Sequence, residues 1–170
     1  MSGHQVSVAD LIKLYKLEEH PEGGYFTQTY RANAQILAST EKDKYKGPRY
    51  YSTGIYYLLP GGARSKLHKI LSDEMWHFYL GGPMKIIELW PDGRVTETIL
   101  GTDVLGGQVV QHVVPAGNWF GGFPLEGTNF SFVGCTVSPG FDFEDFEFGN
   151  KETLLKDYPK AKELISKLLD

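Results

Sequence analysis

The sequence contains a single cysteine, Cys135, among its 170 residues. One cysteine excludes a disulfide framework within the chain and is typical of a reducing compartment. No apolar run approaches the roughly 20 residues that a transmembrane helix needs. The first residues also lack the basic start and apolar stretch of a secretory signal. The sequence therefore predicts a cytoplasmic protein, with Cys135 as a small buried side chain rather than a nucleophile.

Excess positive charge is absent as well. The chain has 17 Lys and Arg against 21 Asp and Glu, which gives a formal net charge of −4. Such a balance gives no general electrostatic attraction for nucleic acid or for an anionic membrane. We therefore expect neither of these partners and favour a small-molecule ligand.

Short strands separated by Gly and Pro turns occupy most of the chain. Aromatic and β-branched residues concentrate in segments 23–32, 50–60, 64–70, 75–82, 84–90, 94–100, 108–115 and 128–137. Many short strands with regular breaks predict an all-β sandwich or barrel. With 41% hydrophobic residues available for a core, we expect one domain over residues 1–170, with its β-core at about 22–148.

The two ends of the chain have helical patterns instead. Ser7 followed by Asp10 is typical of a capped helix start, which predicts a helix over about residues 8–18. Helices are also predicted over about residues 151–169, where apolar residues form one stripe. Segment 141–148, FDFEDFEF, alternates aromatic and acidic residues, and we interpret it as an edge strand with one solvated face. Residues 39–49 are predicted to form an exposed loop, and His4 a disordered tail.

Segment 62–81, GARSKLHKILSDEMWHFYLG, gathers residues that can carry chemistry. Side chains alternate between the faces of a strand, so Arg64, Lys66 and His68 should point the same way. Glu74 opens the next strand. By the same alternation His77 points away from Glu74, unless a bulge re-aims it.

The spacing of this segment resembles the first cupin motif, G-x5-H-x-H-x3–4-E-x6-G, with Ile70 in place of the second His. Residues 115–120, PAGNWF, resemble the second motif, P-x-G-x-x-H, with Phe120 in place of its His. Together with HPEGGYF (20–26), SDEMWHFYLGGP (72–83), VPAGNWFGG (114–122) and GCTVSPGFDFEDFE (134–147), these segments resemble the cupin-5 family, a domain of unknown function. The resemblance implies a double-stranded β-helix, or jelly roll, with short flanking helices at both termini, and a homodimer.

Cupins of the usual kind bind a metal through three His and one Glu, and the resemblance maps these ligands to His68, Ile70, Glu74 and Phe120. Two of these four side chains cannot donate to a metal. We therefore predict a site without metal or cofactor. A weak site that uses His68, Glu74 and His77 is the alternative.

Without a metal, His68 beside Glu74 can still perform acid–base chemistry. Similar metal-free deoxysugar epimerases of the cupin fold use a His base and a Tyr acid. This resemblance implies His68 as the base and Glu74 as its orienting carboxylate. The tyrosine partner is left open among Tyr51, Tyr56, Tyr57 and Tyr79.

Charged and aromatic residues nearby suggest the ligand. Arg64 and Lys66 would favour an anionic ligand if they share the face of His68; otherwise a shifted register leaves them paired with surface acids. The resemblance to the epimerases implies that such a ligand is sugar-derived. The expected pocket walls or core are Trp76, Phe78, Trp119 and Phe120. Glu22, ahead of two glycines, forms a turn or closes over the barrel mouth.

Three functions follow from these residues. The first is a metal-independent isomerase or epimerase that acts by proton transfer at His68. The second is a non-catalytic small-molecule binding protein on the same scaffold. The third is a metal-dependent oxygenase, which the missing ligands disfavour.

Overall fold

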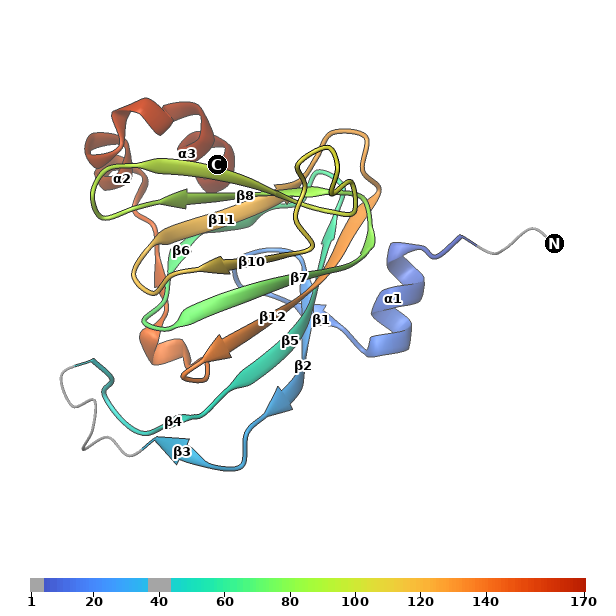
Figure 1. Cartoon of the computed structure of the whole chain (residues 1–170), viewed down its shortest axis with the longest axis horizontal. Coiled ribbons are helices and arrows are strands. Elements are labelled where there is room, and N and C mark those ends of the chain that lie inside the picture. Colours follow the sequence, from blue (N-terminus) through green and yellow to red (C-terminus); the bar gives the residue numbers. More distant parts are fainter. Residues whose placement is uncertain (1–4, 37–43) are drawn as a thin grey trace.

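The computed structural model describes residues 5–36 and 44–170. Two antiparallel sheets face each other (Figure 1). The larger sheet has the strand order β1 (Glu18–Glu19), β2 (Tyr25–Arg31), β5 (Thr53–Pro60), β12 (Phe130–Ser138), β7 (Asp73–Gly81), β10 (Gln111–Val114). The smaller sheet has the order β13 (Glu147–Phe148), β6 (Ser65–Lys69), β11 (Trp119–Pro124), β8 (Met84–Leu89), β9 (Val95–Leu100). A separate pair joins β3 (Gln35–Ile36) to β4 (Arg49–Tyr50). The predicted all-β architecture is thus confirmed.

The main core lies between the two sheets. Alternation along β8 directs Met84 and Ile86 inward, while Ile87 and Leu89 pack on the opposite face. The inward side chains of β5, β7 and β12 complete this core. Both faces of each sheet are therefore partly buried, which accounts for the high aromatic and aliphatic content of the strands.

Helix α1 (Val8–Tyr15) packs on the outer face of the six-stranded sheet, against residues of β5 and β12. Its predicted start is confirmed in detail, because Ser7 and Asp10 form a reciprocal capping box. The helix ends three residues before the predicted position 18. Lys16 adopts a left-handed conformation with φ of 52°, which terminates the helical hydrogen bonding.

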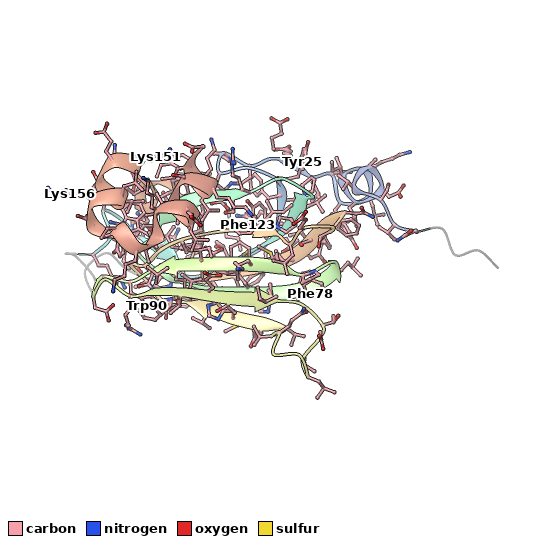
Figure 2. All side chains as sticks on the ribbon, turned by 90° about the horizontal axis from the view of Figure 1, so that it is seen from above. Tyr25, Phe78, Trp90, Phe123, Lys151 and Lys156 are labelled. Atoms are coloured by element: carbon pink, nitrogen blue, oxygen red, sulfur yellow. The ribbon has the colours of Figure 1, made fainter. Side chains whose placement is uncertain are left out.

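The C-terminal helices α2 (Lys151–Asp157) and α3 (Lys162–Leu169) cover the outer face of the five-stranded sheet (Figure 2). A 3-10 turn, η2 (Pro159–Ala161), connects them. Leu154, Ile165 and Leu168 are buried against Leu67 and Ile87 of the sheet. The prediction of helices over residues 151–169 is confirmed. No helix in the described part of the chain is both long and apolar enough to span a bilayer.

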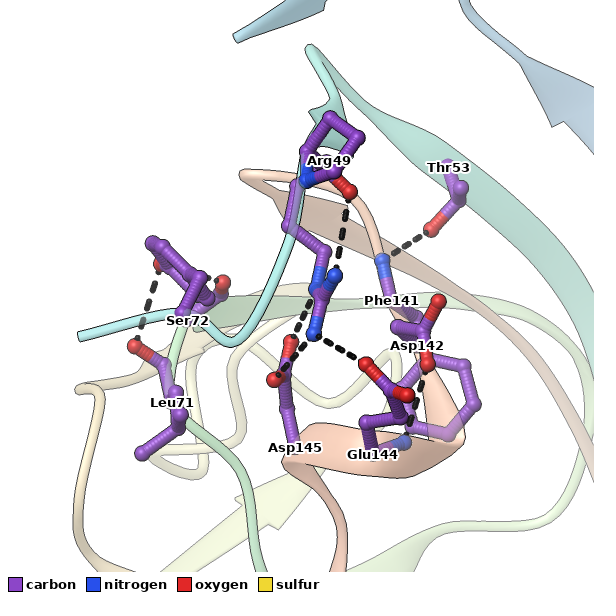
Figure 3. A network of polar contacts seen from close by, with 10 residues as sticks. Arg49, Thr53, Leu71, Ser72, Phe141, Asp142, Glu144 and Asp145 are labelled. Carbon is purple, nitrogen blue, oxygen red and sulfur yellow. Dashed lines mark hydrogen bonds and ion pairs between the residues drawn. The ribbon is translucent and has the colours of Figure 1, made fainter. Parts of the chain in front are cut away.

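Residues 141–148 do not form the predicted edge strand. They form a 3-10 turn, η1 (Phe143–Asp145), and only the last two residues pair as β13. Asp145 is buried and accepts two hydrogen bonds from Arg49, 2.7 and 2.8 Å long, and Arg49 also reaches Glu144 at 3.3 Å (Figure 3). The acidic charge at Asp145 therefore serves an internal ion pair, not solvation. His4 and residues 39–43 of the predicted loop lie outside the described residues. In the rest of that loop the prediction of exposure is wrong at two positions, because Tyr45 and Arg49 are buried and hydrogen-bond Ser72 and Asp145.

Candidate functional site

A pocket of about 110 Å³ lies between the two sheets. Strands β2, β5, β6, β7 and β12 contribute to it, together with the segment before β2 and the segment after β12. Its polar wall consists of His20, Glu22, Gln28, Thr53, His68, Glu74 and Cys135. Its apolar wall consists of Phe26, Ile55, Val137, Phe141 and Phe143. The chain thus places two histidines and two glutamates in one small cavity.

His68 enters this pocket because β6 contains a β-bulge. His68 pairs with Phe120 on β11, and Ser65 pairs with Gly122, so three residues of β6 span the length of two on β11. The extra residue breaks the alternation, and both Ser65 and His68 are buried while Lys66 is exposed.

Both ring nitrogens of His68 are engaged. Nδ1 lies 2.7 Å from the carbonyl oxygen of Lys66, and Nε2 lies 3.0 Å from a carboxylate oxygen of Glu22. A carbonyl oxygen only accepts, so Nδ1 must carry a proton. A proton must also lie between Nε2 and the carboxylate, because two lone pairs at that distance would repel.

The electrostatics place this second proton on the ring. Burial alone would lower the pKa of His68, but the adjacent Glu22, and more weakly Glu74, raise it above its ordinary value. Burial alone would raise the pKa of Glu22, but the charge and hydrogen bond of His68 hold it below its ordinary value. The pair is therefore an imidazolium and a carboxylate near neutral pH.

Glu74 is the second carboxylate of the pocket. It is only 8% exposed, and it makes no ion pair with any residue that the structure describes. Burial raises the pKa of Glu74 to about 7, against the attraction of His68 and with the repulsion of Glu22. The Cys135 thiol lies in the same pocket, and burial keeps the pKa of that thiol well above its usual range. Glu74 can therefore accept and release a proton near pH 7, whereas Cys135 stays protonated.

The segment that precedes β2 carries His20 and Glu22 into the pocket. The backbone N–H of Glu22 donates to Nδ1 of His20 over 3.1 Å, so Nδ1 carries no proton and the proton of the neutral ring is on Nε2. Burial lowers the pKa of His20, and this effect outweighs the attraction of Glu22, which raises it. The lowered pKa keeps the His20 ring neutral. Among the described residues Nε2 has no hydrogen-bond partner, although the side chain is only 7% exposed. His20 thus presents an unused donor.

Two features fix this segment in place. Gly23 has a φ of +114°, and a Cβ there would lie 2.1 Å from the carbonyl oxygen of Arg64, so only glycine fits. The hydroxyl of Tyr57 donates to the carbonyl oxygen of Gly23 over 2.7 Å. Glu22 therefore lies in a turn, as one interpretation of the sequence expected, and this turn also directs its side chain into the pocket.

The aromatic mouth of the pocket is anchored from behind. Phe141 and Phe143 pack edge to face, with ring centroids 4.9 Å apart. The backbone N–H of Phe141 donates to the Thr53 hydroxyl over 2.9 Å, and the Arg49–Asp145 pair fixes the following turn (Figure 3). The internal ion pair thus supports the walls of the site without entering it.

Arg64 and Lys66 are not in the pocket with His68. The Arg64 guanidinium donates to the backbone carbonyl of Lys167 on α3, over 3.0 Å, in a separate surface groove. Lys66 is exposed. The bulge in β6 is the physical reason, because it separates the direction of His68 from that of the preceding residues.

The four predicted aromatic residues are divided among different regions. Phe120 lies under His68, with ring centroids 4.1 Å apart, and Trp76 is fully buried in the core next to Phe120. Phe78 packs at the border of the same core. Trp119 lies on the outer face, where Lys69 sits over its ring at 4.3 Å. Phe120 therefore lies directly under the pocket, and Trp76 pairs with the pocket residue Cys135 across β7 and β12.

The remaining candidate histidines lie elsewhere. His77 points away from Glu74, as strand alternation predicts, and its ring contacts Thr136 at 2.9 Å. His112 lies 2.6 Å from the buried Glu88, outside the pocket. None of the four tyrosines considered as an acid partner lines the pocket. The closest to it is Tyr57, whose hydroxyl is used by the loop.

The residues present do not fit the metal centre of a usual cupin. Two of the four positions carry Ile70 and Phe120, both buried in the core. His68 has no nitrogen lone pair available, because its two nitrogens face Lys66 and Glu22. Within residues 5–36 and 44–170, no group of three His, Cys, Asp or Glu side chains is arranged to hold a metal.

Sequence reasoning did not identify several residues of the site. His20, Gln28, Thr53, Phe141 and Phe143 come from segments whose patterns are those of ordinary turns and strands. The one available signal was Glu22 ahead of Gly23 and Gly24, since two glycines in left-handed conformations mark a specific turn.

The region of the chain that is similar to known proteins includes every residue of this pocket. The chain matches the family model described as Cupin superfamily (DUF985) over residues 9–149. Uncharacterized protein YML079W of Saccharomyces cerevisiae is 35% identical over 159 residues, 88% of this chain and 79% of that protein. The crystal structure of protein SO0799 from Shewanella oneidensis has a TM-score of 0.87 at 37% identity, and covers 98% of this chain and 99% of that one. A hypothetical protein from Leishmania major has a TM-score of 0.85 at 30% identity, with 96% and 99% covered.

Proposed function

The chain belongs to the DUF985 family of the cupin superfamily, and from this premise we propose that it is a metal-independent isomerase that moves a proton between neighbouring carbons of a small hydroxy-carbonyl compound. The observation that carries the proposal is Glu74, a buried carboxylate that has no ion-pair partner among the described residues and whose pKa is raised to about 7 by burial. A general base is most effective when its pKa lies near the working pH.

Glu74 takes the role of the base in this proposal. Its carboxylate removes the proton from the carbon next to the carbonyl group, and the C–H electrons form an enediolate. The protonated Glu74 then returns the proton to the former carbonyl carbon. One base on one face is sufficient for such a shift, and this supports an isomerase over an epimerase that needs a group on each face.

His20 serves as the electrophile. Its Nε2–H is a free donor on a ring kept neutral, and it can hydrogen-bond the carbonyl oxygen of the substrate. As charge develops on that oxygen, Nε2 gives it the proton and takes another from the neighbouring hydroxyl. The ring is an imidazolate between the two transfers and is neutral again after the second, so the former carbonyl oxygen ends as a hydroxyl and the former hydroxyl oxygen as a carbonyl.

His68 has a different role from the base expected from the sequence. Its Nε2–H already donates to Glu22, so no lone pair is available to remove a proton from carbon. As an imidazolium it supplies positive charge close to the enediolate. The negative Glu22 holds that charge in place and completes a neutral pair.

The test is hydrogen exchange at carbon. Dihydroxyacetone and glyceraldehyde are incubated with the protein in D2O with a chelator at pH 7.5, and loss of the C–H signals is followed by NMR. We expect exchange with the intact protein, and a loss of about a hundredfold or more in Glu74→Gln. Glu88→Gln is the matched control, since Glu88 is also a buried carboxylate, but it binds His112 and Asn118 outside the pocket. Equal exchange in Glu74→Gln and in the intact protein would overturn the proposal.

A further inference from the structure

The net charge of the lining residues bears on which ligands the pocket can bind. The lining residues contribute two carboxylates and two histidines, of which only His68 is positively charged. That charge is already matched by Glu22 at 3.0 Å. When Glu74 ionises, the pocket carries a net negative charge, so a second anion would meet repulsion without a partner.

No lysine or arginine among the described residues offsets this charge from within the pocket. Arg64 is bound to α3 and Lys66 is exposed on the far side of the bulge. Arg49 lies behind the aromatic mouth, where Asp145 and Glu144 occupy its guanidinium. A phosphate or carboxylate group would therefore find no ion-pair partner inside the site.

Several lining groups suit hydroxyls instead. His20 offers its free Nε2–H, and Thr53 retains its hydroxyl proton because its oxygen accepts from the Phe141 backbone. Gln28, which is exposed at the rim, offers both a donor and an acceptor, and Glu74 offers acceptors. A cavity lined by both donors and acceptors matches a molecule with several hydroxyl groups.

The volume limits the size of the ligand. About 110 Å³ corresponds to roughly four water-sized groups at about 30 Å³ each. The cavity therefore holds the polar end of a small molecule, or the whole of a three-carbon compound.

We propose that the pocket is selective for uncharged, short-chain hydroxy-aldehydes and hydroxy-ketones and excludes their phosphate esters. This inference rests on the proposed function for the identity of the reacting group, but it concerns binding and can fail separately. It also replaces the anionic ligand that Arg64 and Lys66 suggested in the sequence.

Dihydroxyacetone and dihydroxyacetone phosphate form the matched pair of probes. Each is titrated into the intact protein at pH 7.5, and binding is read from NMR shifts of the His20 and His68 ring signals. We expect the uncharged probe to bind at least about tenfold more tightly, because juxtaposed like charges are strongly unfavourable in a buried site. Equal or tighter binding of the phosphate ester, or no binding of either probe, would overturn the selectivity.

A variant tests the cause of this selectivity. Gln28→Lys adds a cation at the rim, where an exposed side chain tolerates the change. It should improve binding of the phosphate ester about tenfold and leave Glu74 in place. Glu97→Gln, which removes an exposed carboxylate on β9 bound to Lys85, is the control and should change neither affinity.

The outcomes separate this inference from the proposed function. If dihydroxyacetone binds more tightly than its phosphate ester but shows no C–H exchange, the selectivity holds and the isomerase activity is refuted. If C–H exchange is faster with the phosphate ester, the isomerase activity holds and the selectivity for uncharged compounds is refuted.

Discussion

Replacing Glu74 by Gln should stabilise the protein at alkaline pH although it removes the proposed base. The folded state raises the pKa of this carboxyl from 4.5 to about 7. A carboxyl with a raised pKa in the folded state costs nothing while it is protonated in both states. The cost appears as the pH rises above 4.5 and is complete once the pH exceeds the folded pKa of about 7.

The magnitude follows from the two pKa values. Each pKa unit corresponds to about 1.4 kcal/mol, so ionised Glu74 costs the folded state about 3 kcal/mol at pH 8 and less than about 1 kcal/mol at pH 5. Glutamine has the shape of the protonated acid and avoids this cost. In a chain of this size, about 3 kcal/mol corresponds to a Tm increase of roughly 6–12 °C.

Urea unfolding of the intact protein and Glu74→Gln at pH 5 and pH 8 measures the effect. We expect the variant to gain about 2–3 kcal/mol relative to the intact protein on going from pH 5 to pH 8. Glu88→Gln, in which a different buried carboxylate is lost, should not become relatively more stable at pH 8. A Glu74→Gln variant with the same relative stability at both pH values would refute the raised pKa and the base assigned to it.

Three further predictions concern the support of the site. Glu22→Gln should destabilise the protein more at pH 6 than at pH 8, because the raised pKa of its His68 partner contributes stability that is lost as the pH rises through it; equal losses in urea unfolding would argue against the ion pair. Arg49→Met should lower the free energy of unfolding by about 3–5 kcal/mol, because it leaves the buried Asp145 carboxylate without its partner. Adding Asp145→Asn should restore part of that stability, and additive losses in urea unfolding would contradict the ion pair. Gly23→Ala should weaken probe binding about tenfold or more, since a Cβ would collide with a carbonyl oxygen at 2.1 Å; unchanged binding would mean that the loop can relax.

The fold was largely predictable because local patterns determine it. The capping box at Ser7, the turn glycines and the strand composition all describe short segments. Strand β11 (Trp119–Pro124) was missed because its two glycines weaken the strand pattern. Gly121 is required there by long-range packing, since a Cβ would lie 2.6 Å from the carbonyl oxygen of Ser65 at the bulge.

The site was predictable only in part for a similar reason. The motif spacing pointed to His68 and Glu74, which both line the pocket, and Ile70 and Phe120 are buried in the core. The partner of His68 comes from position 22, far away in the sequence, and no local rule connects the two. The one-residue bulge in β6 was equally invisible, and it moved Lys66 out of the predicted pocket.

Measuring the protonation states of His68 and Glu74 tests the charged His68–Glu22 pair and the raised pKa of Glu74 together. In protein labelled with ¹⁵N and ¹³C, ring nitrogen and side-chain carboxyl shifts can be followed from pH 4 to pH 9 by NMR. We predict that both nitrogens of His68 carry a proton at pH 7 and that the Glu74 carboxyl titrates with a pKa of about 7. A neutral His68 at pH 7, together with a Glu74 that titrates at its ordinary value of 4.5, would contradict this prediction.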